Sequence, residues 1–243
     1  MAQAHAHCRN SKDSIAMNLP IVQSPDGITL VGGGPVTRAE LAMALRLAPI
    51  VVAADGGADR ALAAGIMPEA VVGDFDSISA RARAVIPAER QHVVAEQATT
   101  DFDKALRSVE APFVLALGFA GARIDHGLAV LNGLVRHRDR LCLLVGTRDV
   151  VFHAPPRLEL QMRVGDRLSL FPLARVTGRS AGLEWPIDGL DFAPDGMIGT
   201  SNRVVARRVV LEMDAAGMLV ILPRNRLQAA LTALRPEWTP RAG

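Results

Sequence analysis

The sequence predicts an α/β domain with a mostly parallel sheet and flanking helices, followed by a C-terminal all-β sandwich domain. Two patterns support this fold class. Up to Val145, short apolar runs that fit buried strands alternate with stretches of helical periodicity, which is typical of a parallel sheet covered by helices. After Gly146, short segments separated by turn residues indicate an all-β module of about 75 residues.

These patterns divide the chain into four segments. Residues 1–26 lack the apolar core of a signal peptide, and we expect them to be a disordered leader or a remnant of the expression vector. Residues 27–147 form the predicted α/β domain and residues 148–223 the predicted sandwich. Residues 224–243 are a C-terminal tail with one candidate helix over 227–234.

Strands and helices are expected to alternate through the first domain. The strands are predicted over 28–31, 49–54, 70–72, 91–95, 112–117 and 141–145, and the helices over 36–47, 58–64, 79–85, 102–109 and 127–137. Gly65 caps the second helix, and Pro68 precedes the third strand. In the second domain, strands are predicted over 150–154, 157–162, 167–171, 175–177, 204–213 and 218–222.

The first strand is followed by three glycines, of which Gly33 is the candidate phosphate contact. The backbone amides of a glycine turn between a strand and a helix can face a phosphate. Such glycines also fit a tight turn alone. The spacing of a dinucleotide-binding fingerprint is absent because Thr37 occupies its last position, which disfavours a Rossmann dehydrogenase.

Four aspartates, Asp55, Asp74, Asp101 and Asp125, each lie just beyond a different predicted strand. Ligands of parallel α/β sheets bind beyond the carboxyl ends of the strands, so we expect these acids to converge. Each of them alone also fits a turn or a helix cap. Four independent caps at one edge are less probable than a site for a cation and phosphate.

Two acidic clusters flank one α/β unit of this domain. Asp74 and Asp76 point the same way if the extended conformation persists beyond the strand, which suits two ligands of one hard cation. Thr100 and Asp103 have the spacing of a helix capping box. Asp101 falls in the first turn of that helix, where the amide dipoles favour an anion, either its own carboxylate or a ligand phosphate.

Two basic residues are candidates for the same site. Lys104 is the only lysine outside the N-terminal segment, since Lys12 is the other lysine among 27 lysines and arginines. A compact point charge beside two aspartates fits a functional role, and it also fits a solvated helix position. Arg123 follows flexible glycines and can pair with phosphate. His126 is interpreted as a structural histidine.

The composition argues against several classes of protein. A net charge of +2 is too near neutral to indicate a nucleic-acid partner, and no apolar run is long enough to span a bilayer. Cys8 and Cys142 are too few and too far apart for a disulfide framework or a zinc site, and they suggest a reducing compartment. A cytoplasmic protein is therefore expected.

Six sequence motifs follow one another along both predicted domains: DGGADRAL at 55–62, VVGDFDS at 71–77, TDFDKAL at 100–106, GARIDH at 121–126, GLEWPIDGL at 182–190 and GTSN at 199–202. In this order they strongly resemble the thiamine pyrophosphokinase family, also called thiamine diphosphokinase. Six such matches across two domains are far more specific than any one of them.

The resemblance implies an α/β catalytic domain and a sandwich that helps bind thiamine, assembled as a homodimer. Each active site would lie between the catalytic domain of one subunit and the sandwich of the other. The cofactor would be Mg²⁺ with ATP as co-substrate, and the metal ligands would be Asp74, Asp76 and Asp101. Beside these ligands, the resemblance and the residue pattern place Asp55, Thr100, Arg123 and Asp125 near the ATP phosphates, and Gln97, Trp185, Ser201 and Asn202 near thiamine.

The implied reaction transfers an intact diphosphate from ATP to the hydroxyethyl oxygen of thiamine, giving thiamine diphosphate and AMP. Lys104 and Arg123 would offset negative charge. Without the resemblance, the residues support only a Mg²⁺-dependent nucleotide or phosphate enzyme, so a phosphohydrolase is one alternative. A thiamine-binding or sensing protein with weakened catalysis is another, because Ala98 stands where the family usually has an aspartate.

Overall fold

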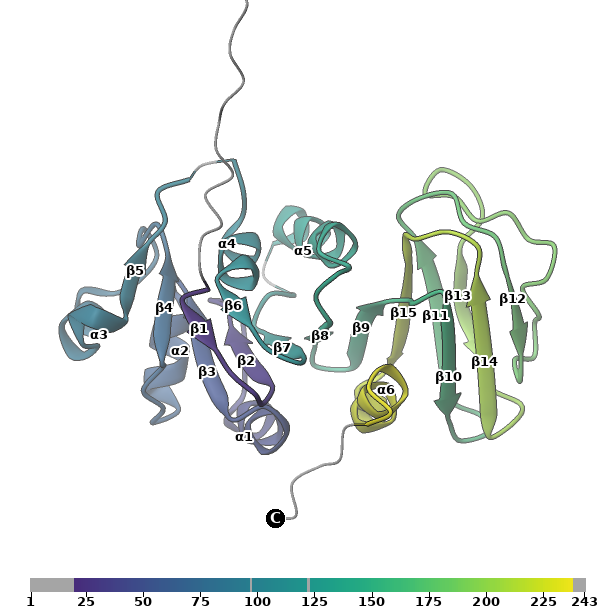
Figure 1. The fold of residues 1–243 in the computed structure, drawn as a ribbon, viewed down its shortest axis with the longest axis horizontal. Helices are drawn as coiled ribbons and strands as arrows, with labels where there is room; N and C mark the ends of the chain where they lie inside the picture. Colours follow the sequence, from purple (N-terminus) through teal and green to yellow (C-terminus); the bar gives the residue numbers. More distant parts are fainter. Residues whose placement is uncertain (1–19, 97, 122, 238–243) are drawn as a thin grey trace, which may run out of the picture.

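The structure is a computed structural model that describes residues 20–96, 98–121 and 123–237. Strands and helices alternate through its first part (Figure 1). They are β2 (Ile28–Val31), α1 (Arg38–Leu47), β3 (Ile50–Ala54), α2 (Gly57–Ala63), β4 (Ala70–Gly73), α3 (Ala80–Val85), β5 (Gln91–Val93), α4 (Asp101–Arg107), β7 (Val114–Leu117), α5 (Ile124–Arg136) and β8 (Cys142–Val145). All the strands and helices predicted for this part are present, with ends shifted by a few residues.

Helix α4 is shorter than the predicted helix over 102–109. It ends at Arg107 because the next residues form β6 (Val109–Glu110), which pairs in parallel with β1 (Val22–Gln23). The prediction that residues 1–26 lie outside the fold is therefore wrong at its C-terminal end. Val22 is buried against the core. A strand of two residues is too short to show a pattern in the sequence, and its pairing with β6 becomes visible only in the structure.

The second part is built from strands, as predicted. They are β9 (Asp149–His153), β10 (Arg157–Gln161), β11 (Arg167–Pro172), β12 (Gly178–Ala181), β13 (Gly199–Arg203), β14 (Arg208–Met213) and β15 (Met218–Pro223). Three details differ from the prediction. Residues 175–177 contain only an isolated bridge at Val176, and β12 follows them; the strand predicted over 204–213 begins at Arg208. Polar β13 was not predicted, because it exists through pairing with β11 and lacks apolar alternation.

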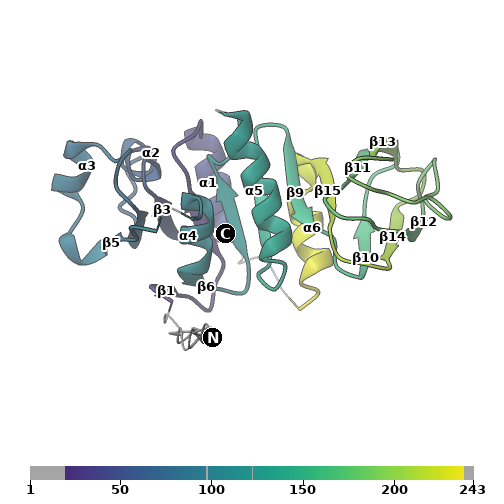
Figure 2. The ribbon, with the colours of Figure 1, turned by 90° about the horizontal axis from the view of Figure 1, so that it is seen from above.

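One sheet runs through both parts of the chain. Its order is β13-β11-β15-β9-β8-β7-β2-β3-β4-β5, and Figures 1 and 2 show these strands spread from one end of the molecule to the other. The six strands from β8 to β5 in this order pair in parallel, and β8 pairs antiparallel with β9 across the turn at 146–148. The domain boundary that we predict at 147/148 thus falls at a hairpin inside a continuous sheet.

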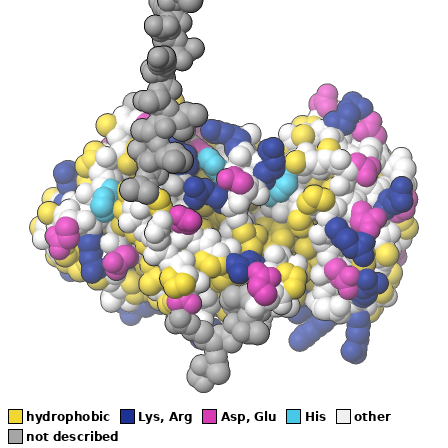
Figure 3. All heavy atoms as spheres, in the orientation of Figure 1, with side chains coloured by type: hydrophobic (Ala, Val, Ile, Leu, Met, Phe, Trp, Pro, Cys, Tyr) yellow, Lys and Arg dark blue, Asp and Glu magenta, His cyan; other side chains and the backbone are white. Residues whose placement is uncertain are grey.

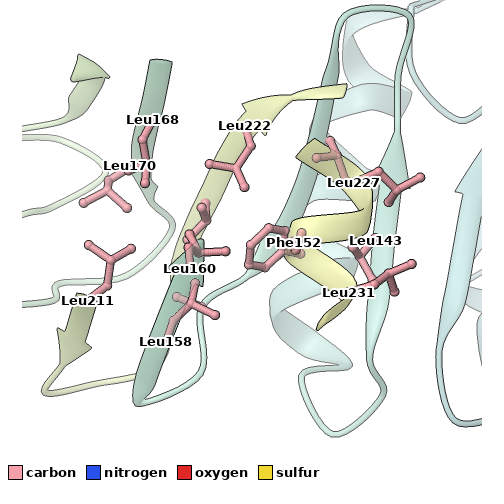
Figure 4. Close-up of a cluster of buried hydrophobic side chains, with 14 of the residues drawn as sticks. Leu143, Phe152, Leu158, Leu160, Leu168, Leu170, Leu211, Leu222, Leu227 and Leu231 are labelled. Atoms are coloured by element: carbon pink, nitrogen blue, oxygen red, sulfur yellow. The ribbon is translucent and has the colours of Figure 1, made fainter. Parts of the chain in front are cut away.

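A second sheet, of order β10-β14-β12, faces the end of the long sheet and completes the sandwich. Buried leucines from both sheets, including Leu160, Leu170 and Leu211, form one core (Figure 4). Helix α6 (Leu227–Leu234) covers this core through Leu227 and Leu231, so the predicted tail contains an ordered helix.

Helices cover both faces of the parallel strands. Alternate strand residues pack against α4 and α5 on one face, as in the cluster of Leu30, Val52 and Phe102. The intervening residues pack against α1, α2 and α3 on the opposite face. This two-sided burial explains why the strands read as continuous apolar runs, and it leaves the strand ends as the place where polar side chains can gather.

The surface seen in Figure 3 carries acidic and basic side chains interspersed over both parts of the chain. Many of them form ion pairs, such as Arg208 of β14 with Glu159 of β10, and Arg203 of β13 with Glu184 in the segment before it. Within the described residues, none of the helices has the length and apolar character needed to cross a membrane.

Candidate active site

A cavity of about 850 Å³ opens beyond the carboxyl ends of the parallel strands. From β2 the chain continues outward through β3, β4 and β5, then returns to β7 and β8 on the other side of β2. This change of direction is the place where open α/β sheets bind their ligands. The cavity, called the acidic pocket below, is lined by residues that follow β2, β3, β4 and β7 and by the start of α4; its charged lining residues are Asp55, Asp59, Arg60, Asp74, Asp101, Lys104, Arg123 and His126.

The glycines around the pocket let the strand ends approach closely. A Cβ at Gly32 or Gly34 would lie 2.6 Å from the carbonyl oxygen of Gly118, and one at Gly57 would lie 1.8 Å from that of Val31. Side chains cannot fit there. Gly33, the predicted phosphate contact, lines the pocket, and a Cβ there would make only ordinary contacts. Its position is therefore open to a ligand.

Three aspartates form a compact triad in this pocket. One carboxylate oxygen from each of Asp55, Asp74 and Asp101 lies within 4.8 Å of the others, a grouping that can hold a metal ion. Asp55 is only 2% exposed, and its Oδ1 is the buried side-chain oxygen that has no hydrogen-bond partner in the described part of the chain. Oxygen ligands of this kind suit a hard cation, so the donor set fits Mg²⁺.

The electrostatics of Asp55 reflect its crowded environment. Burial and the neighbouring Asp76 raise the pKa of Asp55 to about 6, although the backbone amide of Ser77 donates a hydrogen bond to Oδ2 at 3.2 Å. Its backbone has a φ of +43°, a left-handed conformation that turns the chain sharply at the end of β3. Strand-end geometry thus forces a carboxyl group inward, where charge is costly without a cation.

Lys104 lies between two members of the triad. Its Nζ donates to Asp74 Oδ2 at 2.9 Å and to Asp101 Oδ1 at 3.2 Å, and its side chain is 2% exposed. Burial disfavours the ammonium, but these hydrogen bonds outweigh burial and raise the pKa of Lys104. The hydrogen bond from Lys104 also lowers the pKa of Asp74. Lys104 is therefore a buried cation of the site and not a solvated helix residue.

The expectation that Asp74 and Asp76 point the same way from an extended segment is wrong in its geometry. Phe75 between them has a φ of +66°, so the chain turns after β4 and does not continue as a strand. Asp76 is exposed, accepts a hydrogen bond from the Ser77 hydroxyl at 2.7 Å and lies next to Asp55. Asp55, which the sequence does not assign to the metal, has a carboxylate oxygen within 4.8 Å of those of Asp74 and Asp101, whereas Asp76 as a metal ligand stays a prediction.

The start of α4 is fixed by a capping box. The Thr100 hydroxyl accepts from the Asp103 amide at 3.2 Å and donates to Asp103 Oδ2 at 2.8 Å. Asp103 is buried, and its Oδ1 is 2.9 Å from His137 Nε2 at the end of α5. Thr100 and Asp101 are thus oriented toward the pocket by a residue that does not itself line it.

Asp125 does not join the triad. It is exposed at the start of α5 and pairs with Arg123, whose Nε lies 3.1 Å from Asp125 Oδ1. Arg123 itself lines the pocket, and so does His126, which the sequence predicts to be a structural histidine. The expected convergence of four acids therefore holds for Asp55, Asp74 and Asp101 only.

The predicted thiamine residues lie in the other part of the chain. Asn202 is buried on β13 and hydrogen-bonds both the amide and the carbonyl of Trp185, while the Trp185 ring is exposed and the Arg203 guanidinium lies 6.0 Å from its centre. Ser201, also exposed, has a φ of +62°. Gln97 lies outside the described residues, and Ala98 is exposed just before α4.

Strand order sets the separation between these residues and the acidic pocket. In the long sheet, β13 and β4 are eight strand spacings apart. At about 4.8 Å for each spacing, this places them roughly 40 Å apart before sheet twist is considered. The described residues of one chain therefore do not bring Trp185 and Asp74 to one small ligand.

Several pocket residues were missed by sequence reasoning. Asp59 accepts hydrogen bonds from Ser79, and the Arg60 side chain donates to the Gly33 carbonyl oxygen at 3.2 Å. Phe119 packs edge-on against Phe102, with ring centres 5.1 Å apart. Asp59 and Arg60 belong to the motif DGGADRAL, which begins at Asp55. Their position in that motif could have identified them as candidates for the site.

Comparison with known proteins gives a consistent result for both parts. Residues 41–144 match the family model described as thiamin pyrophosphokinase, catalytic domain, and residues 156–217 match thiamin pyrophosphokinase, vitamin B1 binding domain. Thiamine pyrophosphokinase 1 of Arabidopsis thaliana is 25% identical over 202 residues, which cover 69% of this chain and 76% of that protein.

Solved structures share the fold. Yeast thiamin pyrophosphokinase has a TM-score of 0.69 at 16% identity, covering 84% of this chain and 88% of that chain. The thiamin pyrophosphokinase of Geobacillus thermodenitrificans has a TM-score of 0.67 at 22% identity, covering 81% of this chain and 96% of that one. This likeness in fold supports the division of the chain into an α/β part followed by a β-rich part.

Proposed function

Because the chain belongs to the thiamin pyrophosphokinase family, we propose that its acidic pocket transfers diphosphate from ATP to the hydroxyethyl oxygen of thiamine. The chain is a thiamine diphosphokinase, and the products are thiamine diphosphate and AMP. The observation that carries the assignment to this pocket is the triad of Asp55, Asp74 and Asp101, with its buried unpartnered oxygen, at the ligand-binding edge of the sheet.

Asp55, Asp74 and Asp101 would hold Mg²⁺, with Asp76 beside them. When bound, Mg²⁺ would neutralise charge on the phosphate oxygens. The remaining tasks fall to the protein, because phosphoryl transfer depends mainly on positioning and on electrostatic stabilisation. Gly33 offers open backbone at the pocket wall, and Arg123 offers a guanidinium at its lining.

We assign Thr100 a positioning role. Its hydroxyl both accepts and donates within the capping box, so it holds the first turn of α4 in place. That turn presents Asp101 and Lys104 to the pocket. The β-phosphorus of ATP is the reaction centre, AMP is the leaving group, and the thiamine hydroxyl is the nucleophile. No residue in the pocket stands out as an obligatory base.

For thiamine we propose a site shared between two copies of the chain. Trp185 offers an exposed aromatic face that can stack on a heterocycle, and Asn202 fixes the backbone that carries it. Since β13, which lies beside Trp185, is eight strand spacings from β4, roughly 40 Å, the ring would be supplied to the triad of a second copy in a homodimer. A cytoplasmic location is proposed on the cysteine content alone.

The direct test is an assay of purified protein with ATP and Mg²⁺, with and without thiamine. We expect AMP and thiamine diphosphate to form only when thiamine is present. AMP or ADP released without thiamine would instead indicate a phosphohydrolase. Thiamine binding without AMP release would indicate a sensor in which Ala98 has weakened catalysis.

The shared site has its own test. Chains carrying Asp101→Asn are mixed with chains carrying Trp185→Ala and assayed at low thiamine concentration. If sites are shared in a dimer, mixed dimers contain one site with neither substitution, and activity rises above that of either variant alone. If the activity of the mixture after subunit exchange only equals that expected from the two variants measured separately, the shared site is contradicted.

A further inference from the structure

Lys104 places one positive charge between two carboxylates of the triad, Asp74 and Asp101. Its ammonium contacts Asp74 and Asp101 at 2.9 and 3.2 Å, and only 2% of its side chain is exposed. The neighbouring residues Phe102, Asp103, Ala105 and Leu106 are buried as well, so the lysine stem is enclosed by the packed face of α4. The ammonium therefore has few places to go other than the pocket.

The same two carboxyl groups belong to the triad that can hold a metal ion. Oxygens of Asp55, Asp74 and Asp101 lie within 4.8 Å of each other, and Lys104 occupies hydrogen-bonding positions on two of these groups. The third group, Asp55, has a buried Oδ1 with no hydrogen-bond partner among the residues that the structure describes. The same carboxylates can therefore interact with two cations: the ammonium of Lys104, and a metal ion when one is bound.

We propose that Lys104 competes with the divalent cation for Asp74 and Asp101, so that the metal binds tightly only together with the nucleotide. This inference rests on the proposed diphosphate-transfer site. Phosphate oxygens entering the pocket offer the ammonium a new partner. Lys104 then leaves both carboxylates and pairs with phosphate, and the triad becomes fully available to the metal.

Electrostatics favours this change of partner by Lys104 over a state in which Lys104 and the metal ion share the same carboxylates. Two cations on adjacent carboxylates repel each other, and the repulsion is screened less where one of them, Lys104, is only 2% exposed. A buried ammonium without a partner is costly, so Lys104 does not withdraw unless a new acceptor is present. Lysine suits this role because its single charge on a flexible stem can change partners, whereas the planar guanidinium of arginine is built for one bidentate geometry.

The first test measures binding of Mn²⁺ alone, by electron paramagnetic resonance of the free ion, with no nucleotide present. Lys104→Met removes the competing charge, and we expect its Mn²⁺ affinity to be at least about tenfold tighter than that of the unsubstituted chain. The matched control is Arg107→Met, which removes one positive charge from the same helix. Arg107 pairs with Glu96 outside the triad and is 43% exposed, so Mn²⁺ affinity should change by less than about twofold.

The second test uses the native protein and does not depend on a variant that might fold poorly. The chain has only two lysines, so lysine labelled with ¹³C at Cε gives two side-chain signals, and Lys12→Arg assigns them. We expect the Lys104 signal to move when Mg²⁺ and α,β-methylene ATP are added together. Mg²⁺ alone should move it only at much higher metal concentrations.

The outcomes separate this inference from the proposed function. Equal or weaker Mn²⁺ binding by Lys104→Met, or a Lys104 signal that stays fixed while metal and nucleotide saturate the protein, would overturn the competition while leaving the metal site intact. An absence of Mn²⁺ binding in every form, with or without nucleotide, would overturn the triad as a metal site and the competition with it. Lys104→Arg should keep the weak binding of Mn²⁺ alone, because it keeps the charge.

Discussion

The acidic pocket and the surface around Trp185 differ in how far a single chain completes them. In the pocket, Asp55 and Lys104 are each 2% exposed, and the lysine is held by two carboxylates. At the other end of the sheet, Trp185 is 57% exposed; Asn202 fixes its backbone, and the Arg203 guanidinium lies 6.0 Å from the centre of its ring. The pocket is therefore organised by its own chain, whereas the Trp185 surface holds an aromatic ring ready for a ligand or a second chain to cover.

The largest expected effect comes from breaking the pocket. Asp101→Asn removes one carboxylate of the triad, and turnover should fall by about a thousandfold because several kcal/mol of charge stabilisation are lost. The measurement is AMP release in the presence of thiamine, together with circular dichroism to confirm the fold. Asp139→Asn, an exposed position in the turn after α5, is the matched control and should keep normal rates. Near-normal turnover in Asp101→Asn would show that the metal assignment is wrong.

The next effect concerns the sheet that separates the two regions. Phe152 on β9 is fully buried in a core that includes Leu143 of the α/β part and Leu160 of the sandwich. Phe152→Ala should lower the free energy of unfolding by about 3–5 kcal/mol. Because the core is shared, calorimetry should show one transition for both parts, before and after the substitution.

The exposed Val85 provides the control for this experiment, and Val85→Ala should leave the unfolding temperature nearly unchanged. Two separate transitions, of which only one moves in Phe152→Ala, would contradict the view that one sheet joins the acidic pocket and the Trp185 surface into a single unit.

A smaller effect is expected from Asp103, which supports the pocket from behind. Burial opposes its ionisation, but hydrogen bonds from Thr100 and His137 outweigh burial and hold the pKa of Asp103 below 3.8. Asp103→Asn should therefore cost about 1–3 kcal/mol at neutral pH. As the pH falls, the unfolded chain takes up its proton first, so this stabilisation is complete above roughly pH 4 and is lost as the pH falls through the native pKa.

Urea titrations at several pH values measure this contribution. The difference in unfolding free energy between native protein and Asp103→Asn should shrink as the pH falls below about 4. Asp139→Asn, which alters an exposed carboxylate of the same charge, should show no comparable loss at neutral pH. A difference that stays constant with pH would mean that the ionised form of Asp103 is not what stabilises the start of α4.

The smallest effect on the protein itself is expected at the Trp185 surface. Trp185→Ala should raise the KM for thiamine by about tenfold, since stacking on an aromatic ring contributes on the order of 1 kcal/mol, and should leave the unfolding temperature unchanged. Val164→Ala, another exposed apolar position in the same part, should change neither quantity. A large fall in stability would show that the ring serves the core of this chain instead of a ligand.

Most of the fold could be predicted from local patterns. Apolar runs such as 112–117 and helical periodicity such as that of 36–47 are properties of a few neighbouring residues, and the corresponding elements are present. Strand β1 and polar β13 could not be predicted in this way, because they exist through hydrogen bonds with distant segments and not through their own composition.

The site was predicted in part for the same reason. Asp55, Asp74 and Asp101 follow strands of one parallel sheet, so their convergence follows from topology. Asp125 was expected with them, but it pairs with Arg123 two residues away. Asp76 was expected to point with Asp74, but the positive φ of Phe75 turns the chain between them. Backbone conformation at a single residue decided that outcome.

Residue order and local periodicity were enough to predict the family, the α/β and β-rich parts, and the strand ends that carry the acidic side chains. Three features depend on tertiary structure: Lys104 donates hydrogen bonds to both Asp74 and Asp101, a carboxylate oxygen of Asp55 lies within 4.8 Å of theirs, and the strand order of one continuous sheet separates Trp185 from them. Distances between side chains far apart in sequence arise from packing and strand order, which no short stretch of residues specifies.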